Sequence, residues 1–363
     1  MLEQIAWFAA GLAALVVGAA FLVRGASSLA LAVGLSPLVI GLTVVAFGTS
    51  APEVAVSVGA AAKGSADIAI GNVVGSNIFN VLFIVGISAL VVPLVVDAQI
   101  VRQEVPIMIA ASFGLVAAAW NGVIGFVDGA VFLAALAAYT AFLVVQARRQ
   151  GATIQGEYEG EFGRGPGRSR SSVMGGAILR MITGLALLVA GSRWLVDAAV
   201  HFAQAAGVSE LVIGLTIVSA GTSLPEVATS LAAAVKGERD IAVGNVVGSS
   251  TFNILGCLGL SALVSPAGLP VAPSVLNFDL WVMVAVALAC LPVFLTGHTV
   301  ARWEGLLFLA AYVAYVAYLI LAAAEHDALP KLSSAMTVFV APLVAVTLAI
   351  TVYREWRSRG RSG

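Results

Sequence analysis

Two short motifs place a carboxylate beside hydroxyl groups and a proline inside long apolar stretches of the chain. Residues 48–53 read GTSAPE, and residues 221–226 read GTSLPE. A charged side chain near the centre of a bilayer costs about 2.5–3.5 kcal/mol even on lenient insertion scales, so each glutamate needs a functional partner. Because proline removes one backbone N–H and clashes with the preceding turn, we expect carbonyls near Ala46 and Ser219 to become available to an ion.

A second pair of motifs supplies amide and hydroxyl oxygens. Residues 71–80 read GNVVGSNIFN, and residues 244–253 read GNVVGSSTFN. Their polar side chains recur every four residues, which puts them on one face of a helix. Such a stripe either binds a ligand or joins helices by hydrogen bonds, and at positions 72 and 245 both interpretations stay open. The stripe comprises Asn72, Ser76 and Asn80 in the first motif and Asn245, Ser249 and Asn253 in the second.

The candidate ligands are all oxygen atoms, from carboxylate, hydroxyl, amide and backbone carbonyl groups. Hard cations such as Ca²⁺, Na⁺ and Mg²⁺ take oxygen ligands, and Ca²⁺ accepts six to eight of them in irregular geometry. Softer metals favour imidazole or thiolate. Two ionised glutamates carry a charge of −2, which one Ca²⁺, two monovalent cations or two protons would balance. That equivalence is an electrical basis for cation exchange at one shared site.

The composition places these motifs in a membrane. Of the 363 residues, 60% are hydrophobic and only 10% are charged, with a mean hydropathy of +1.04. Soluble domains carry about 25% charged residues. A soluble enzyme and a disordered scaffold are therefore excluded, and a net charge of −1 leaves no basic face for nucleic acid. We expect a multi-pass protein whose apolar residues face the lipid bilayer.

About 20 apolar residues cross the hydrocarbon core as a helix. The sequence contains eleven such runs, and the last of them has no counterpart elsewhere in the chain. They lie near residues 5–33, 37–62, 67–92, 104–120, 123–146, 174–206, 210–235, 240–264, 277–296, 302–323 and 334–353.

The Lys and Arg residues predict the orientation, because cytoplasmic loops carry an excess of them. With the N-terminus outside, only Lys63 and Lys331 fall on the outer side. We therefore expect a cell inner-membrane protein with a cytoplasmic C-terminus. Thirteen residues then lie in cytoplasmic segments: Arg102, Arg148, Arg149, Arg164, Arg168, Arg170, Lys236, Arg239, Arg302, Arg354, Arg357, Arg359 and Arg361.

The chain contains an internal repeat. Residues 41–90 align with residues 214–263 without a gap at an offset of 173, and 32 of the 50 positions are identical, polar ones included. Each copy spans five predicted helices, so the second copy enters the membrane from the opposite side, as in many secondary transporters. We expect an all-α integral membrane protein with a ten-helix inverted repeat (5+5) and an eleventh C-terminal transmembrane helix.

This architecture divides the chain into four parts. Residues 1–146 form the first repeat with helices one to five, and residues 147–172 form a flexible cytoplasmic linker. Residues 173–326 form the second repeat with helices six to ten. Residues 327–363 hold the extra helix and a basic cytoplasmic tail.

Both copies resemble the α-repeats of the cation/calcium antiporter family, the sodium/calcium exchangers and their prokaryotic relatives. The resemblance rests on GTSAPE with GNVVGSNIFN and on GTSLPE with GNVVGSSTFN. It implies central cation ligands at Glu53, Asn80, Glu226 and Asn253. It also implies long, tilted first and sixth helices that slide across the core. The flanking sodium ligands implied are Thr49, Ser50, Ser76, Thr222, Ser223 and Ser249, with the carbonyls of Ala46 and Ser219.

One position departs from the family pattern. A sodium-coupled relative may carry aspartate where this chain has Asn253, so the site holds two carboxylates rather than three. We expect an antiporter that exports Ca²⁺ in exchange for Na⁺, with Ca²⁺/H⁺ exchange as the alternative. A channel and an intramembrane protease are further alternatives, although the chain offers no nucleophile–base pair. We expect no cofactor and no obligatory protein partner.

Overall fold

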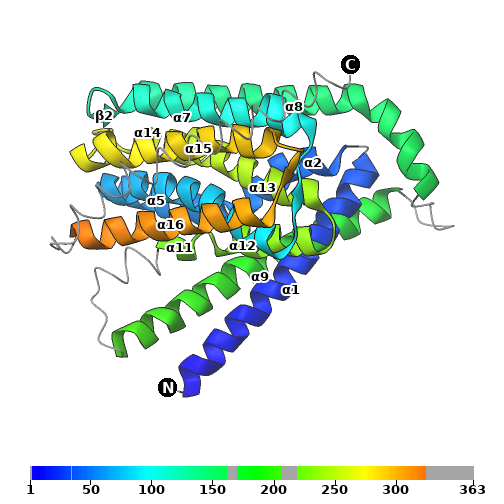
Figure 1. The fold of residues 1–363 in the computed structure, drawn as a ribbon, viewed down its shortest axis with the longest axis horizontal. Coiled ribbons are helices and arrows are strands. Elements are labelled where there is room, and N and C mark those ends of the chain that lie inside the picture. Colours follow the sequence, from blue (N-terminus) through cyan, green and yellow to red (C-terminus); the bar gives the residue numbers. More distant parts are fainter. Residues whose placement is uncertain (1, 34, 162–169, 206–218, 324–363) are drawn as a thin grey trace.

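The computed structural model describes residues 2–33, 35–161, 170–205 and 219–323, with side chains undescribed at 2, 148–161, 170–172, 203, 219 and 323. It is built of helices, with short π-helical segments labelled η and four two-residue strands (Figure 1). The elements up to residue 161 are α1 (Leu2–Val33), α2 (Pro37–Ile40), η1 (Gly41–Val45), α3 (Ala46–Thr49), α4 (Ala51–Ala62), α5 (Ala66–Phe79), η2 (Asn80–Val85), α6 (Gly86–Val91), β1 (Leu94–Val95), η3 (Ile100–Glu104), α7 (Val105–Ala119), β2 (Val123–Ile124) and α8 (Phe126–Glu161).

The later elements follow the same order. They are α9 (Arg170–Ala205), α11 (Ser219–Gly221), α12 (Leu224–Val235), α13 (Arg239–Phe252), η5 (Asn253–Leu258), α14 (Gly259–Val264), β3 (Leu269–Pro270), η6 (Val275–Asp279), α15 (Leu280–Leu295), β4 (Thr299–Val300) and α16 (Arg302–Ala323).

Eight helices of the described part are long and apolar enough to cross a membrane, and they coincide with eight of the predicted spans. The pair Pro37–Thr49 and Ala51–Ala62, which bends by 46°, makes nine when it is counted as one broken span. The chain is therefore an all-helical, multi-span membrane protein. The predicted span 334–353 lies outside the described residues, as does the first part of the predicted span 210–235, of which α11 and α12 are described.

Two predicted boundaries differ from the structure. The fourth span begins at Ile100 rather than at residue 104, because the π-helical segment η3 adds a turn before α7. The helix α8 does not end at residue 146 but continues to Glu161, and α9 begins at Arg170, so helix covers much of the predicted linker. The polar composition of residues 147–172 predicted a loop. A helix outside the membrane can consist of polar residues, so this composition does not exclude a helix.

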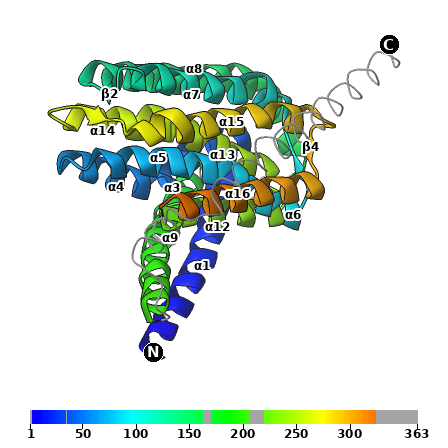
Figure 2. The same cartoon turned by 60° about the vertical axis from the view of Figure 1, so that its left-hand side comes forward.

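The span Ala66–Val91 and the span Arg239–Val264 form the centre of the bundle. In these spans 78% and 89% of the residues of the most apolar window are buried, against 11% in Arg302–Ala322. The other helices of the bundle run alongside them, while α1 and α9 lie together and cross obliquely beneath (Figure 1). The second view shows the same separation of this pair from the bundle (Figure 2).

Strands join the two halves of the chain at both ends of the bundle. The strand β1 pairs with β4, and β2 pairs with β3, both antiparallel. In each ladder one strand comes from the first half of the sequence and the other from the second half. Because β2 and β4 lie at opposite ends (Figure 2), each end of the bundle is fastened across the halves.

The helices α1 and α9 pack backbone against backbone through glycines spaced seven residues apart. A Cβ added at Gly18 would lie 2.8 Å from the carbonyl oxygen of Gly184, and one at Gly11 would lie 2.8 Å from that of Gly191. Real Cβ atoms do not approach so closely, so only glycine allows this contact. The antiparallel pair therefore forms one closely packed unit.

We predict that Gly184→Ala lowers the stability of the protein by about 1–3 kcal/mol, because its methyl group would overlap the backbone of Leu22. The matched control is Gly175→Ala on the same helix, where an added Cβ meets nothing within 4 Å. The control should be neutral or stabilising by up to about 1 kcal/mol. Thermal unfolding of both variants in detergent measures the difference, and equal melting temperatures would contradict the packing.

Candidate functional site

The two glutamates of the sequence motifs lie just after breaks in their helices. Between α3 and α4 the chain turns at Ser50, and between α11 and α12 it turns at Ser223, with nearly equal dihedral angles (φ −79°, ψ 7° and φ −88°, ψ 6°). Each break precedes a proline in the first turn of the next helix, followed directly by the glutamate. Glu53 and Glu226 thus lie at helix N-termini, where the helix dipole favours negative charge.

Each carboxylate accepts a hydrogen bond from the other motif. The Ser50 hydroxyl donates to Glu226 Oε1 at 3.1 Å, and the Ser223 hydroxyl donates to Glu53 Oε1 at 2.8 Å. Both glutamates and both serines are buried. The two breaks, 173 residues apart in the sequence, therefore face each other at one site.

The second oxygen of each carboxylate has no hydrogen-bond partner among the described residues. Leaving a buried acceptor unpaired costs about 1–3 kcal/mol or more, so these oxygens are favourable positions for a bound ligand. Further unpartnered polar atoms lie on the two central helices. They are Oδ1 of Asn77, Oδ1 and Nδ2 of Asn80, Nδ2 of Asn253 and the hydroxyl oxygens of Ser88, Ser249 and Ser261.

The two central asparagines each begin a π-helical segment. Asn80 is the first residue of η2, and Asn253 is the first residue of η5. Single-turn π segments in α-helices occur often at functional sites, because the extra residue redirects side chains. The Ser76 and Ser223 hydroxyls are hydrogen-bonded to each other at 3.1 Å, which connects this helix to the carboxylate site.

The open question at Asn72 and Asn245 is answered by their contacts. Asn72 Nδ2 donates to the Ser57 hydroxyl at 2.9 Å and to the Glu53 carbonyl at 3.3 Å, while its Oδ1 accepts the Thr222 hydroxyl at 3.2 Å. Asn245 repeats the pattern. It donates to Ser230 at 2.9 Å and accepts the Thr49 hydroxyl at 3.1 Å. Both asparagines therefore hold residues of the two motifs in place.

Two carbonyls beside the helix breaks accept hydrogen bonds within the chain. The residue four positions before Pro225 is Gly221, and its carbonyl accepts the Ser192 hydroxyl of α9 at 2.5 Å. The Ala46 carbonyl accepts the Ser50 N–H at 3.0 Å. Ser219 begins α11, and its side chain lies outside the described residues.

The structure therefore brings most of the predicted ligands together. Thr222 is half-buried, and the others whose side chains are described are buried. The donor set consists of oxygens apart from the amide nitrogens, and the described residues hold no cluster of three or more His, Cys, Asp or Glu. Two carboxylates with hydroxyl and amide oxygens suit a hard cation such as Ca²⁺ or Na⁺.

Sequence reasoning missed a second pair of acids outside this site, of which Glu104 is buried and Asp279 is half-buried. Glu104 accepts the Tyr139 hydroxyl at 2.6 Å and two glutamine amides, and Asp279 accepts the Tyr315 hydroxyl at 2.9 Å. Each acid ends a π-helical segment, η3 or η6. The acids lie 175 and the tyrosines 176 residues apart, so extending the repeat alignment with small gaps would have found them.

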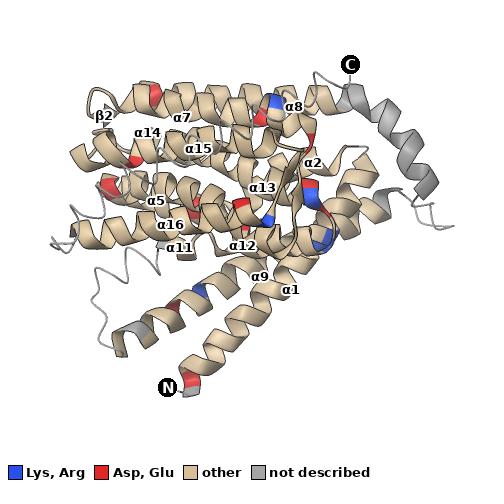
Figure 3. Cartoon of the chain, viewed as in Figure 1, with Lys and Arg blue, Asp and Glu red and all other residues tan. Residues whose placement is uncertain are grey.

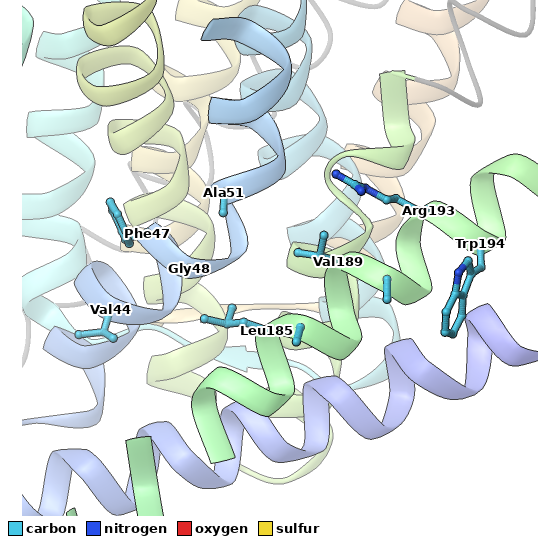
Figure 4. A pocket seen from close by; sticks show the side chains of 10 residues that line it. Val44, Phe47, Gly48, Ala51, Leu185, Val189, Arg193 and Trp194 are labelled. Atoms are coloured by element: carbon cyan, nitrogen blue, oxygen red, sulfur yellow. The ribbon is translucent and has the colours of Figure 1, made fainter. Parts of the chain in front are cut away.

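A groove with a volume of about 620 Å³ separates α3 from α9. Apolar side chains line most of it, and Arg193 and Trp194 lie at one end (Figure 4). Gly48 faces Leu185 across it, and an added Cβ there would lie 2.8 Å from the leucine side chain. The groove reaches the helix break without including either glutamate, so the carboxylates stay closed off in this arrangement.

Comparisons with known proteins agree on one kind of relative. A family model described as sodium/calcium exchanger protein matches residues 3–145 and 176–321. The sodium/calcium exchanger MaX1 of Methanosarcina acetivorans is 34% identical over 340 residues, 85% of this chain and 96% of that protein. The inner membrane protein YrbG of Escherichia coli is 36% identical over 296 residues, 80% of this chain and 89% of that protein.

The fold matches a solved exchanger as well. A structure of the sodium-calcium exchanger NCX_Mj, soaked with 2.5 mM Na⁺ and 0.1 mM Ca²⁺, superposes with a TM-score of 0.73 at 30% identity. The match covers 87% of this chain and 98% of that one.

We predict that Asn72→Leu weakens Ca²⁺ binding by about 10–100-fold, because outer partners of this kind position the ligands. The matched control is Asn77→Leu on the same helix, since Asn77 is also buried but contacts Met283 instead. The Ca²⁺-dependent rise in melting temperature measures both affinities. An Asn72 variant that binds as tightly as the Asn77 variant would contradict the positioning role.

Proposed function

The chain belongs to the sodium/calcium exchanger protein family, and from that premise we propose that it exports Ca²⁺ in exchange for Na⁺ across a cell inner membrane. The family consists of exchangers rather than enzymes, so the function lies in binding and release of ions. The observation that carries the proposal is the reciprocal pair of buried carboxylates. Each is held by the other motif's serine, and each has one oxygen with no hydrogen-bond partner among the described residues.

In this proposal Glu53 and Glu226 bind Ca²⁺ directly, and Asn80 and Asn253 complete the central shell. The hydroxyls of the two motifs bind Na⁺ when it replaces Ca²⁺. Bound cations cancel the charge of the carboxylates, so only a loaded site can be moved past the apolar parts of the protein. The sodium ligands are Thr49, Ser50, Ser76, Thr222, Ser223 and Ser249, with the carbonyls of Ala46 and Ser219.

We further propose that the two halves of the chain form an inverted repeat, with five helices in residues 1–146 and five in residues 173–326. The N-terminus then lies outside and the C-terminus in the cytoplasm, after an eleventh helix at 334–353. Support comes from elements that recur at an offset of 173, such as η2 with η5 and α4 with α12. The strand pairs and hydrogen bonds that cross between the halves add to it.

Alternating access requires that the two halves differ at any moment, and they do. Gly48 and Gly221 occupy equivalent positions, yet both face α9, through Leu185 and Val196. Ser76 is hydrogen-bonded, while its equivalent Ser249 has no partner among the described residues. We propose that the tightly packed α1–α9 unit slides along the apolar groove and exchanges these environments.

The counter-ion depends on Asn253. With two carboxylates rather than three, the site can be neutralised by one Ca²⁺, two Na⁺ or two protons. The alternative proposal is therefore Ca²⁺/H⁺ exchange.

We predict that Glu53→Gln and Glu226→Gln each abolish ⁴⁵Ca²⁺ exchange in vesicles while the protein remains folded, because each removes half of the charge that balances Ca²⁺. The matched control is Glu104→Gln, which changes a buried glutamate with no contact to the site. This control should retain exchange. Exchange that persists in either site variant would contradict the ligand assignment.

A second experiment separates the counter-ions. ⁴⁵Ca²⁺ uptake into vesicles is measured under an imposed Na⁺ gradient and, separately, under a pH gradient. We predict a response to Na⁺, and we predict that Asn253→Asp increases it because a third carboxylate favours cation occupancy. A response to pH alone would overturn sodium coupling in favour of the alternative.

A further inference from the structure

A basic pocket of about 420 Å³ lies away from the carboxylate site, between three separate segments of the chain. Arg24 comes from α1, Arg180 from α9, and Lys236 from the turn that follows α12. One acid, Glu238, lines it as well, so three positive charges and one negative charge leave a net charge of +2. The pocket thus joins the α1–α9 unit to the central bundle.

The charge of this pocket is not compensated within the described part of the chain. Arg24 and Arg180 make no ion pair there, and Lys236 donates to a backbone carbonyl, that of Ala20, at 3.2 Å. Burial and the neighbouring charge of Arg24 lower the pKa of Lys236, while Glu238 opposes the shift. The positive charges of Arg24 and Lys236 therefore repel each other, and an anion bound between them would reduce this repulsion.

The repeat shows that this cluster is not a requirement of the fold. At an offset of 173, Arg24 corresponds to Asp197, Arg180 to Trp7 and Lys236 to Lys63. The equivalent place at the other end of the bundle therefore lacks the cluster. Figure 3 shows Lys and Arg mainly at the end near α2, away from the N-terminus. The excess of Lys and Arg in cytoplasmic segments explains why basic residues occur at this end. It does not explain why three of them, from three separate segments, line one pocket.

The position of the pocket indicates which anion it takes. The turn at 236–238 separates the end of α12 from the start of α13, so the pocket lies where two spans leave the membrane. Ser27 and Ser28 donate their hydroxyl protons to carbonyls of their own helix. The guanidinium groups are therefore the groups that would donate hydrogen bonds to a ligand. Guanidinium groups bind phosphate oxygens in pairs, and basic pockets between helices at this level bind lipid head groups.

We propose that the basic pocket binds a phosphate group, presented by an anionic phospholipid of the surrounding leaflet. The bound phosphate bridges α1, α9 and the turn after α12. It thereby stabilises the arrangement of the α1–α9 unit seen in this structure.

The test is the thermal stability of the purified full-length protein in detergent, titrated with phosphatidylglycerol, phosphatidylcholine or inorganic phosphate. We expect phosphatidylglycerol to raise the melting temperature in preference to phosphatidylcholine. The double variant Arg24→Gln/Arg180→Gln should bind phosphatidylglycerol about tenfold or more weakly, because it loses two charge-assisted contacts. Arg24→Lys/Arg180→Lys should keep part of the binding, and Arg180→Gln alone serves if the double variant does not fold.

The matched control is Arg193→Gln, which removes an exposed arginine of the same helix outside this pocket. It should bind phosphatidylglycerol like the unmodified protein. Stabilisation by phosphatidylglycerol that the double variant retains would overturn the site. Stabilisation by inorganic phosphate alone, lost in the double variant, would overturn the lipid as its source.

Discussion

The rest of the structure depends on one constraint: two carboxylates are buried in a membrane protein, and no described Lys or Arg neutralises them. Neither Glu53 nor Glu226 is paired with a described basic residue, and each has one serine hydroxyl and a helix N-terminus to stabilise its charge. That hydroxyl comes from the opposite half of the chain. The halves must therefore be assembled before either carboxylate is satisfied, and binding chemistry and folding share the same contacts.

Local irregularities of the helices follow from this requirement. A regular helix offers its N-terminal N–H groups only at its start, so the two helices that carry glutamates break in the middle of the bundle. Prolines at 52 and 225 make each break permanent, because no N–H remains for the carbonyl one turn earlier. The π-helical segments at Asn80 and Asn253 supply the amides on the facing helices.

The helix bundle and the α1–α9 unit are held together by different kinds of contact. Within the bundle, crossed strand pairs and the acid–tyrosine pairs fasten the helices to one another. Within the α1–α9 unit, glycines allow contact between backbones. Between the unit and the bundle lies an apolar groove, whose side chains form no directional bonds that would have to break. Two described hydrogen bonds cross this boundary, from Ser192 to the Gly221 carbonyl and from Lys236 to the Ala20 carbonyl, and the basic pocket lies on it.

The sequence by itself determined the membrane class, the eight spans that the described helices match and the internal repeat, and it predicted the residues proposed for the site, because apolar length and recurring polar motifs are local signals. It left Asn72 and Asn245 open and missed Ser57, Ser230 and Glu104. Only the tertiary structure decided that each motif completes the carboxylate of the other, because those hydrogen bonds join residues at least 170 positions apart.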